Sequence, residues 1–250
     1  MSALRDLHVH TVFCDGNDTP EEMVLSAIDK GLDCLGICAH SFVAFDPGYC
    51  MAPERYAEFQ TEIARLKAKY RGKIDLLCGI EQDCFSRIEP VGFDYVIGSV
   101  HYLKTAGAYV HVDDTPALFT DGCTDHFGGD YYALAEQYYE TVSHVVEMTG
   151  CDIIAHFDLL TKFNSDDALF DTDDPRYIRA WQDAVDRLIP FGKPFEINTG
   201  AITRKYRKEP YPAKPILDYI LEKGGRTILS SDAHRKEDIA FMFSDLTKLR

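Results

Sequence analysis

Seven short strand-like runs recur along this chain, and each of them ends in a side chain that can bind a metal ion or a polar ligand. The runs are residues 4–10, 34–40, 75–81, 94–101, 152–157, 194–200 and 227–234. Segments with a helical pattern separate most of them, and this alternation is typical of βα units built around a parallel sheet. The sequence therefore predicts an α/β barrel in which the ends of all seven strands share the face that carries active sites.

Six helices are expected between or after the strands, over residues 20–30, 53–70, 131–149, 175–190, 213–223 and 235–248. The first is clearly marked, because Thr19 can cap it, Glu22 completes a capping box and Gly31 ends it. Only about ten residues separate the third and fourth strands, which is short for a crossover, so the barrel should be irregular there. Residues 102–130 have little periodicity and predict a long loop over the barrel mouth. We expect one domain over residues 1–250.

The strand ends hold six of the nine histidines of the sequence, together with two carboxylates and one amide. These residues are His8, His10, His40, Glu81, His101, His156, Asn198, Asp232 and His234. A strand repeats every two residues, so His8 and His10 face one side, and Asp232 and His234 repeat this geometry. Imidazole and carboxylate ligands together favour Zn, Mn or Fe over Mg or Ca. So many ligands indicate more than one ion.

Each of these residues also has a simpler interpretation when it is taken alone. A single histidine is more often a surface or core residue than a metal ligand. That interpretation stands for His111 and His126, as loop residues, and for His144, on a helix face. Asp15 belongs to an Asp-Gly turn pattern, and Glu81 could be a surface carboxylate. The eight cysteines contain no C-x-x-C pair and are expected to be mostly reduced thiols without a chemical role.

A basic segment follows the sixth strand, at the barrel face predicted for the site. It contains Arg204, Lys205, Arg207 and Lys208 in an otherwise acidic chain. Arg204 is expected to contact phosphate, because a planar guanidinium can bind two phosphate oxygens at once. Lys208 could equally be a solvated loop residue.

The charge and hydropathy of the chain exclude several classes of function. A formal net charge of −15 argues against a nucleic-acid surface, which needs clustered Lys and Arg, and favours a small charged substrate. The sequence has no run of 18 apolar residues and no signal-peptide pattern. We therefore expect a cytoplasmic protein that binds neither nucleic acid nor membrane. The sequence leaves the oligomeric state open.

Five motifs in a fixed order resemble the PHP superfamily of polymerases and histidinol phosphatases. They read DLHVHTVFCDG, GIE, GSVH, AHF and SSDAH, and they span residues 6–234. The segments FEINTGAITRK and EPYP, with the long insertion after GSVH, resemble the histidinol-phosphate phosphatase branch. Two positions depart from the pattern. Ala39 stands where relatives generally carry an acidic residue before the histidine, and Cys14 replaces a commoner serine.

This resemblance implies a distorted, TIM-like (β/α)7 barrel with three divalent or transition metal ions. The first ion would be bound by His8, His10, Glu81 and Asp232, the second by Glu81, His101 and His156, and the third by Asp15, His40 and His234. The implied reaction is hydrolysis of L-histidinol phosphate to L-histidinol and phosphate, by hydroxide held between the ions.

The same resemblance suggests roles for residues around the ions. Phosphate contacts are expected from Arg204, Lys205, Arg235 and Ser41. Beside the bridging Glu81 and Arg204, the catalytic residues would include Asp15 and His234, as candidates to protonate the leaving alkoxide. Asp113 or Asp125 could meet the ammonium and imidazole of the substrate, and the sequence does not choose between them.

Three alternatives compete with this interpretation. Another phosphoesterase of the superfamily would act on phosphoprotein, nucleotide, DNA ends or another small monoester. A barrel amidohydrolase also begins with H-x-H, but the basic segment and the third set of ligands favour phosphate. A non-catalytic metal-binding module should have lost ligands, and all nine positions are filled.

Overall fold

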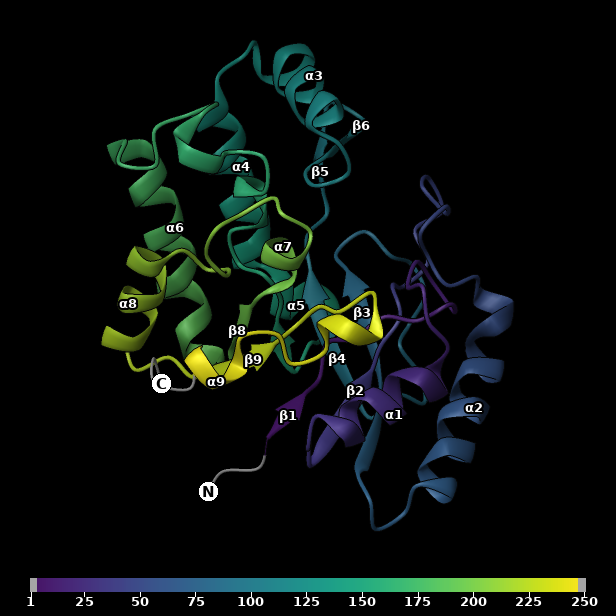
Figure 1. Cartoon of the computed structure of the whole chain (residues 1–250). Coiled ribbons are helices and arrows are strands. Elements are labelled where there is room, and N and C mark those ends of the chain that lie inside the picture. Colours follow the sequence, from purple (N-terminus) through teal and green to yellow (C-terminus); the bar gives the residue numbers. More distant parts are fainter. Residues whose placement is uncertain (1–3, 247–250) are drawn as a thin grey trace.

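The computed structural model describes residues 4–246, and its centre is one sheet of seven parallel strands (Figure 1). In spatial order the strands are β1 (Arg5–Asp6), β2 (Cys34–Ile37), β3 (Asp75–Asp83), β4 (Tyr95–Ser99), β7 (Ile153–Ile154), β8 (Phe195–Asn198) and β9 (Thr227–Ser230). All six pairings are parallel. A further parallel bridge joins Val9, after β1, to Ala233, after β9, and brings the two edges together. The predicted α/β barrel of seven strands is confirmed as a nearly closed barrel.

Helices cover the outside of this sheet on two sides (Figure 1). One side carries α1 (Pro20–Asp29) and α2 (Tyr56–Lys69), and the other carries α4 (Tyr131–Ser143), α5 (Val145–Thr149), α6 (Pro175–Leu188) and α8 (Lys214–Glu222). The start of α1 is as predicted, because Thr19 and Glu22 form a reciprocal capping box. No helix lies between β3 and β4, so the barrel is irregular at the predicted place.

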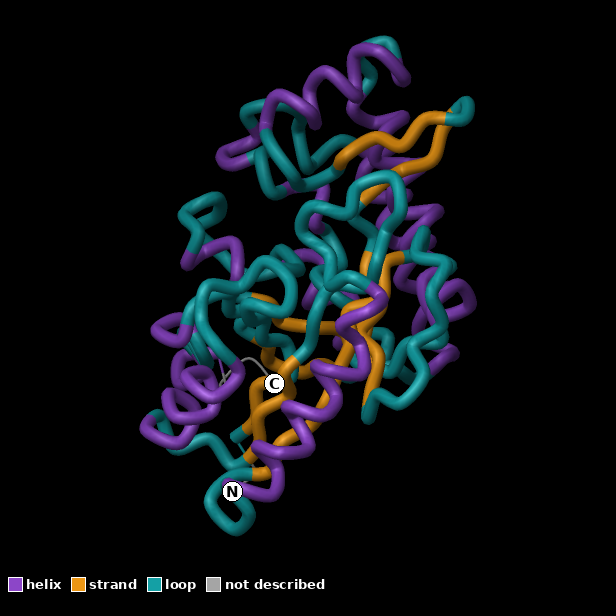
Figure 2. Tube along the Cα trace, turned by 90° about the vertical axis from the view of Figure 1, so that its right-hand side faces the viewer, coloured by secondary structure: helices purple, strands orange, loops and turns teal. Residues whose placement is uncertain are grey.

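The prediction of a loop over residues 102–130 is wrong. This segment forms the hairpin β5 (Tyr102–Thr105) and β6 (Ala108–His111), followed by α3 (Pro116–Phe127). Thr115 caps α3 and Pro116 starts it, but only Phe119 and Cys123 of this helix are buried, so its apolar periodicity is weak. Figure 2 shows the hairpin and its neighbouring helices together at one end of the molecule, far from both termini.

Two predicted helices are interrupted. The segment 131–149 breaks at His144 between α4 and α5. The segment 235–248 contains only a 3-10 turn and α9 (Phe243–Leu246), because Ala240 and Met242 adopt positive φ angles, and residues 247–250 lie outside the described part. The remaining short elements are α7 (Gly200–Thr203) and the 3-10 turns Pro53–Arg55, Leu159–Thr161, Ser165–Asp167, Ile189–Phe191 and Lys236–Asp238.

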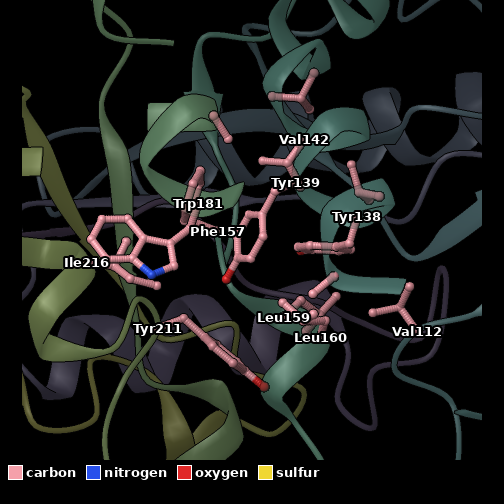
Figure 3. Packing of buried hydrophobic residues seen from close by; sticks show 14 of the residues in the cluster. Val112, Tyr138, Tyr139, Val142, Phe157, Leu159, Leu160, Trp181, Tyr211 and Ile216 are labelled. Carbon is pink, nitrogen blue, oxygen red and sulfur yellow. The ribbon is translucent and has the colours of Figure 1, made fainter. Parts of the chain in front are cut away.

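Two hydrophobic clusters anchor these layers to the strands. The larger lies under α4 and α6 and contains Tyr138, Tyr139 and Trp181 (Figure 3). The other lies under α1 and α2. Burial of such side chains contributes roughly 1.5–3 kcal/mol each, so the strand ends are held by a rigid frame.

A third cluster is built from the strands themselves, around Tyr95. The Tyr95 hydroxyl donates to the Leu7 carbonyl at 2.5 Å. A Cβ on Gly36 or on Gly79 would lie 2.2 Å from an atom of the Tyr95 ring or hydroxyl. These two glycines therefore make the space that lets the ring of Tyr95 lie across β2 and β3.

Among the described residues, none of the helices has the length and apolar character needed to cross a membrane. The eight cysteines are free thiols, as expected.

Candidate active site

Glu81 lies at the centre of the strand ends, and five imidazoles surround its carboxylate. Its Oε2 lies 3.2 Å from His8 Nε2, 3.3 Å from His10 Nε2 and 2.9 Å from His40 Nδ1. Its Oε1 lies 3.3 Å from His101 Nε2 and 3.1 Å from His156 Nε2. The end of β3 therefore gathers histidines from four other strand ends around one side chain.

Asp232 and Asp15 complete the cluster on the side of β9. The Asp232 Oδ1 atom lies 3.5 Å from His10 Nε2 and 3.7 Å from His8 Nε2. Asp15, in the turn after β1, lies 3.1 Å from His234 Nε2 and 3.5 Å from His40 Nε2. The structure thus brings together all nine residues that the sequence suggested as metal ligands. Asp15 is both a turn residue and a member of the cluster.

Bound divalent cations would satisfy these side chains better than the protein groups alone do. Glu81 is buried, and its Oε2 has no hydrogen-bond partner among residues 4–246, although three ring nitrogens lie close to it. Burial would raise the pKa of Glu81, but His40, His8 and His101 hold it well below its usual value, so the carboxylate is ionised. An orphaned buried anion that faces imidazole nitrogens matches the ligand set of Zn, Mn or Fe.

Two buried carboxylates that the sequence analysis missed support the histidines from behind. Glu196, in β8, accepts a hydrogen bond from His8 Nδ1 at 2.7 Å. Asp83, at the end of β3, lies 3.1 Å from His101 Nδ1 and accepts from the His101 amide at 3.0 Å. The period of two in a strand could have found both, because Glu196 precedes Asn198, and Asp83 follows Glu81, by two residues.

A cavity of about 880 Å³ opens above the cluster. Seven of the nine residues line it, while His8 and His10 are fully buried and do not. Its walls also contain Arg204, Lys205 and Arg235. The cavity is therefore large enough for a small organic substrate and is continuous with the cluster.

The basic segment after β8 divides into two groups. Arg204 reaches the site, where its guanidinium lies 3.0 Å from Asp232 Oδ2 and 2.9 Å from His234 Nδ1. Lys205 is exposed at the cavity wall. Arg207 instead pairs with the buried Asp158 at 3.1 Å, and Lys208 pairs with Asp166 at the surface.

Two other expected phosphate contacts have different surroundings. Arg235 lines the cavity but pairs with Asp238 at 2.9 Å. Ser41 is buried and does not line the cavity, and its hydroxyl accepts a hydrogen bond from the Asp83 amide at 3.0 Å. The position of Ser41 therefore does not support its expected phosphate contact, because it holds β3 instead.

The lining of the cavity also contains acidic and aromatic side chains. Asp113 lines the cavity, but Lys162 pairs with this carboxylate at 3.1 Å and, against the effect of burial, lowers its pKa to about 2. Asp125 is exposed on α3 and lies outside the cavity lining. The sequence analysis missed Asp46 and Asp114, which flank His111 at 3.7 and 3.6 Å. His111 lies in β6 and not in a loop.

The remaining two histidines keep their simple interpretation. His126 lies in α3, not in a loop, and is exposed. His144 pairs with Glu140 and Glu147 on the surface, at the junction of α4 and α5.

Comparison with known proteins identifies the family of this chain. The sequence profile of the PHP domain matches residues 6–200. The probable histidinol-phosphatase of Deinococcus radiodurans is 32% identical over 99% of this chain and 93% of its own length. A solved structure from Listeria monocytogenes, assigned as a histidinol phosphatase, superposes with a TM-score of 0.84 at 23% identity, covering 96% of this chain and 99% of that one.

A second solved structure shares the fold over the whole length. It is a histidinol phosphate phosphatase from Lactococcus lactis in complex with zinc, L-histidinol and phosphate, and it superposes with a TM-score of 0.69 at 20% identity. The match covers 98% of this chain and 93% of that one. From the profile match and the Deinococcus relative, this chain belongs to the PHP domain family, in its histidinol-phosphatase branch.

Proposed function

We propose that this chain hydrolyses L-histidinol phosphate to L-histidinol and inorganic phosphate, with three divalent or transition metal ions. The observation that carries the proposal is the cluster of six imidazoles and three carboxylates, seven of which line one cavity together with Arg204. The histidinol-phosphatase relatives support this substrate.

The contacts suggest how the ions would be shared. His8, His10, Glu81 and Asp232 would bind the first, Glu81, His101 and His156 the second, and Asp15, His40 and His234 the third. Ions in these positions would supply an activated water and positive charge for the phosphoryl oxygens. No serine or cysteine belongs to the lining of the cavity in residues 4–246, which favours water as the nucleophile.

The protein groups would bind and orient the phosphate. Arg204 is fixed by Asp232 and by the ring of His234, and its Nε is buried without a partner. A phosphoryl oxygen could accept from this group, because guanidinium and phosphate form paired charge-assisted hydrogen bonds. Lys205 adds a second cation at the same wall. Asp15 and His234 line the cavity and are the candidates to return a proton to the leaving alkoxide.

Two carboxylates of the cavity suit the other end of this substrate. Asp46 and Asp114 line the same cavity as Arg204, and Tyr102 fixes Asp46 through a hydrogen bond of 2.8 Å. A phosphate ester that carries an ammonium and an imidazole would place its anion near Arg204 and its cation near these carboxylates. Asp46 and Asp114 therefore replace Asp113 and Asp125 as the proposed contacts of the cationic end.

The test is phosphate release from L-histidinol phosphate against a panel of other monoesters, with the bound metals counted. The panel contains phosphotyrosine, a nucleoside monophosphate and a neutral alkyl phosphate. Because a charged hydrogen bond is worth about 1.5–3 kcal/mol, we expect kcat/KM for the amino alcohol ester to exceed that of the neutral ester by about 10–100-fold. Equal rates on the neutral ester would overturn the substrate assignment, and no release from any ester would overturn the phosphatase assignment.

A further inference from the structure

Two of the proposed metal-binding histidines differ from the others in the residue that contacts their Nδ1 atom. His8 and His101 each place Nδ1 against a buried carboxylate, Glu196 in the first case and Asp83 in the second. Carboxylate oxygens act as hydrogen-bond acceptors, so these contacts favour the tautomer of each ring in which Nδ1 carries the proton and Nε2 keeps its lone pair. In both rings Nε2 is the atom that faces Glu81.

Glu196 also accepts hydrogen bonds from other donors, and these contacts restrict the movement of its side chain. Its Oε1 accepts from His8 Nδ1, while its Oε2 accepts from the His156 amide at 3.2 Å and from Asn198 Nδ2 at 3.0 Å. One side chain of β8 therefore orients a histidine after β1 and fixes the backbone of a second histidine after β7. The Glu196 side chain is only 1% exposed.

Asp83 binds His101 in a comparable way on the other side of Glu81. Its Oδ2 contacts both the ring and the amide of His101, and its Oδ1 accepts from the Phe85 amide at 2.7 Å. The carboxylate thus fixes the ring relative to its own backbone, and Asp83 is buried.

Within residues 4–246, the third set of ligands has no outer carboxylate of this kind. His40 directs Nδ1 toward Glu81 and Nε2 toward Asp15, so neither nitrogen is left for an outer carboxylate. His234 places Nδ1 between the Asp232 carbonyl, which accepts, and Arg204, which donates. This set is also the more open one, since the Asp15 side chain is 33% exposed and that of His234 is 20% exposed.

We propose that Glu196 and Asp83 are positioning residues that fix the tautomers of His8 and His101, and that the two ions sharing Glu81 are therefore held more tightly than the ion at Asp15, His40 and His234. Outer partners of this kind typically contribute about 10–100-fold to metal affinity. The inference rests on the metal site of the proposed function and adds an order of release among its ions.

The experiment starts from the zinc-loaded chain and removes zinc with chelators of increasing affinity, while the ions that remain are counted. The wild-type chain should release one ion first and two ions only at chelator strengths about 10–100-fold greater. In Glu196→Gln the amide group would face at least one of the donors now bound by the carboxylate. We therefore expect a further ion to leave at chelator strengths about 10–100-fold lower than in the wild type, with the release of the first ion unchanged.

A second readout separates positioning from general stability. Nitrogen-15 spectra of the histidine rings should show a proton on His8 Nδ1 in the wild type and a mixture of tautomers in Glu196→Gln. The matched control is Glu222→Gln, because Glu222 is exposed at the end of α8. If Glu196→Gln fails to fold, Asp83→Asn provides an independent test, in which the ring tautomer of His101 is measured.

The possible outcomes are distinct. Simultaneous release of all ions from the wild-type chain would overturn the inference. So would zinc retention and histidine tautomers in both variants that equal those of the wild type. Either result would leave the proposed function intact. A wild-type chain that binds neither zinc, manganese nor iron would overturn both.

Discussion

At the scale of single residues, Glu81 has the most connected position in the site. Five imidazoles lie within 3.3 Å of its two oxygens, and it is buried. Glu81→Gln keeps the shape but removes the charge that the ions would share. Because loss of an outer partner alone costs about 10–100-fold, we expect the loss of this shared ligand to lower phosphatase activity by more than about 100-fold and to release at least one ion.

Elemental analysis and phosphate release would check this together, with circular dichroism to confirm that the variant folds. Full metal content with unchanged turnover in Glu81→Gln would refute the bridging role.

Arg204 is predicted to act on substrate binding more than on the ions. Its contacts are with Asp232 Oδ2 and His234 Nδ1, whereas Asp232 Oδ1 faces His8 and His10. Removing a charged hydrogen bond costs about 1.5–3 kcal/mol, so Arg204→Ala should raise KM by about 10–100-fold. Steady-state kinetics with metals counted would measure it, and Lys208→Ala is the control because Lys208 is 79% exposed and pairs with Asp166. An unchanged KM would show that Arg204 does not contribute to substrate binding.

The sequence was sufficient to predict the nine clustered residues, but it did not predict the contacts of the residues around them. Histidines and acids at strand ends are visible from sequence because parallel strands end on one face. The role of Ser41 was not visible, since its hydroxyl faces the Asp83 amide and not the cavity. Asp46 was missed because its contact with His111 joins a loop to strand β6, which are far apart in the sequence.

At the scale of elements, the junction of β8 and α7 controls how closely Arg204 approaches Asp232. A Cβ on Gly200 would lie 2.8 Å from the Arg204 guanidinium and 2.9 Å from the Asp232 side chain. Gly200→Ala should therefore displace one of these groups and raise KM by about tenfold, which corresponds to roughly 1.4 kcal/mol of lost interaction. Kinetics would measure the effect. Gly224→Ala, away from the site, is expected to leave KM unchanged, and equal behaviour of the two variants would contradict the prediction.

Elements whose own pattern is strong were predicted, and elements shaped by distant contacts were not. The box of Thr19 and Glu22 determines the start of α1 locally. By contrast, residues 236–240 do not continue as a helix, because Lys30 donates to the carbonyls of Glu237 and Ile239, and Asp6 accepts from the Ala240 amide. These partners lie more than 200 positions away in the sequence, so local propensity could not reveal them.

At the scale of the whole molecule, the barrel closes where the first strand meets the last. Asp6, at the end of β1, is fully buried and accepts from the Ser231 amide at 3.1 Å, from the Ser231 hydroxyl at 2.5 Å and from the Ala240 amide at 2.9 Å. This carboxylate connects the strand that precedes His8 and His10 to the strand that precedes Asp232 and His234. The two halves of the first proposed ion site therefore depend on the seam for their relative position.

Asp6→Ala should open this seam without removing the side chain of a proposed ligand. It removes the acceptor of four donors, the three named above and the His8 amide at 3.4 Å. Each buried unpaired group costs about 1–3 kcal/mol, partly offset because a buried carboxylate is removed, so we expect the free energy of unfolding to fall by about 2–4 kcal/mol. Urea denaturation would measure this loss, and Asp75→Ala, at an exposed position in β3, is the control. Activity should fall further than stability alone explains, because His8 and Asp232 would separate. If the variant loses stability but keeps its ions and its turnover, the prediction is contradicted. The metal site, and not the seam at Asp6, would then be what holds the barrel closed.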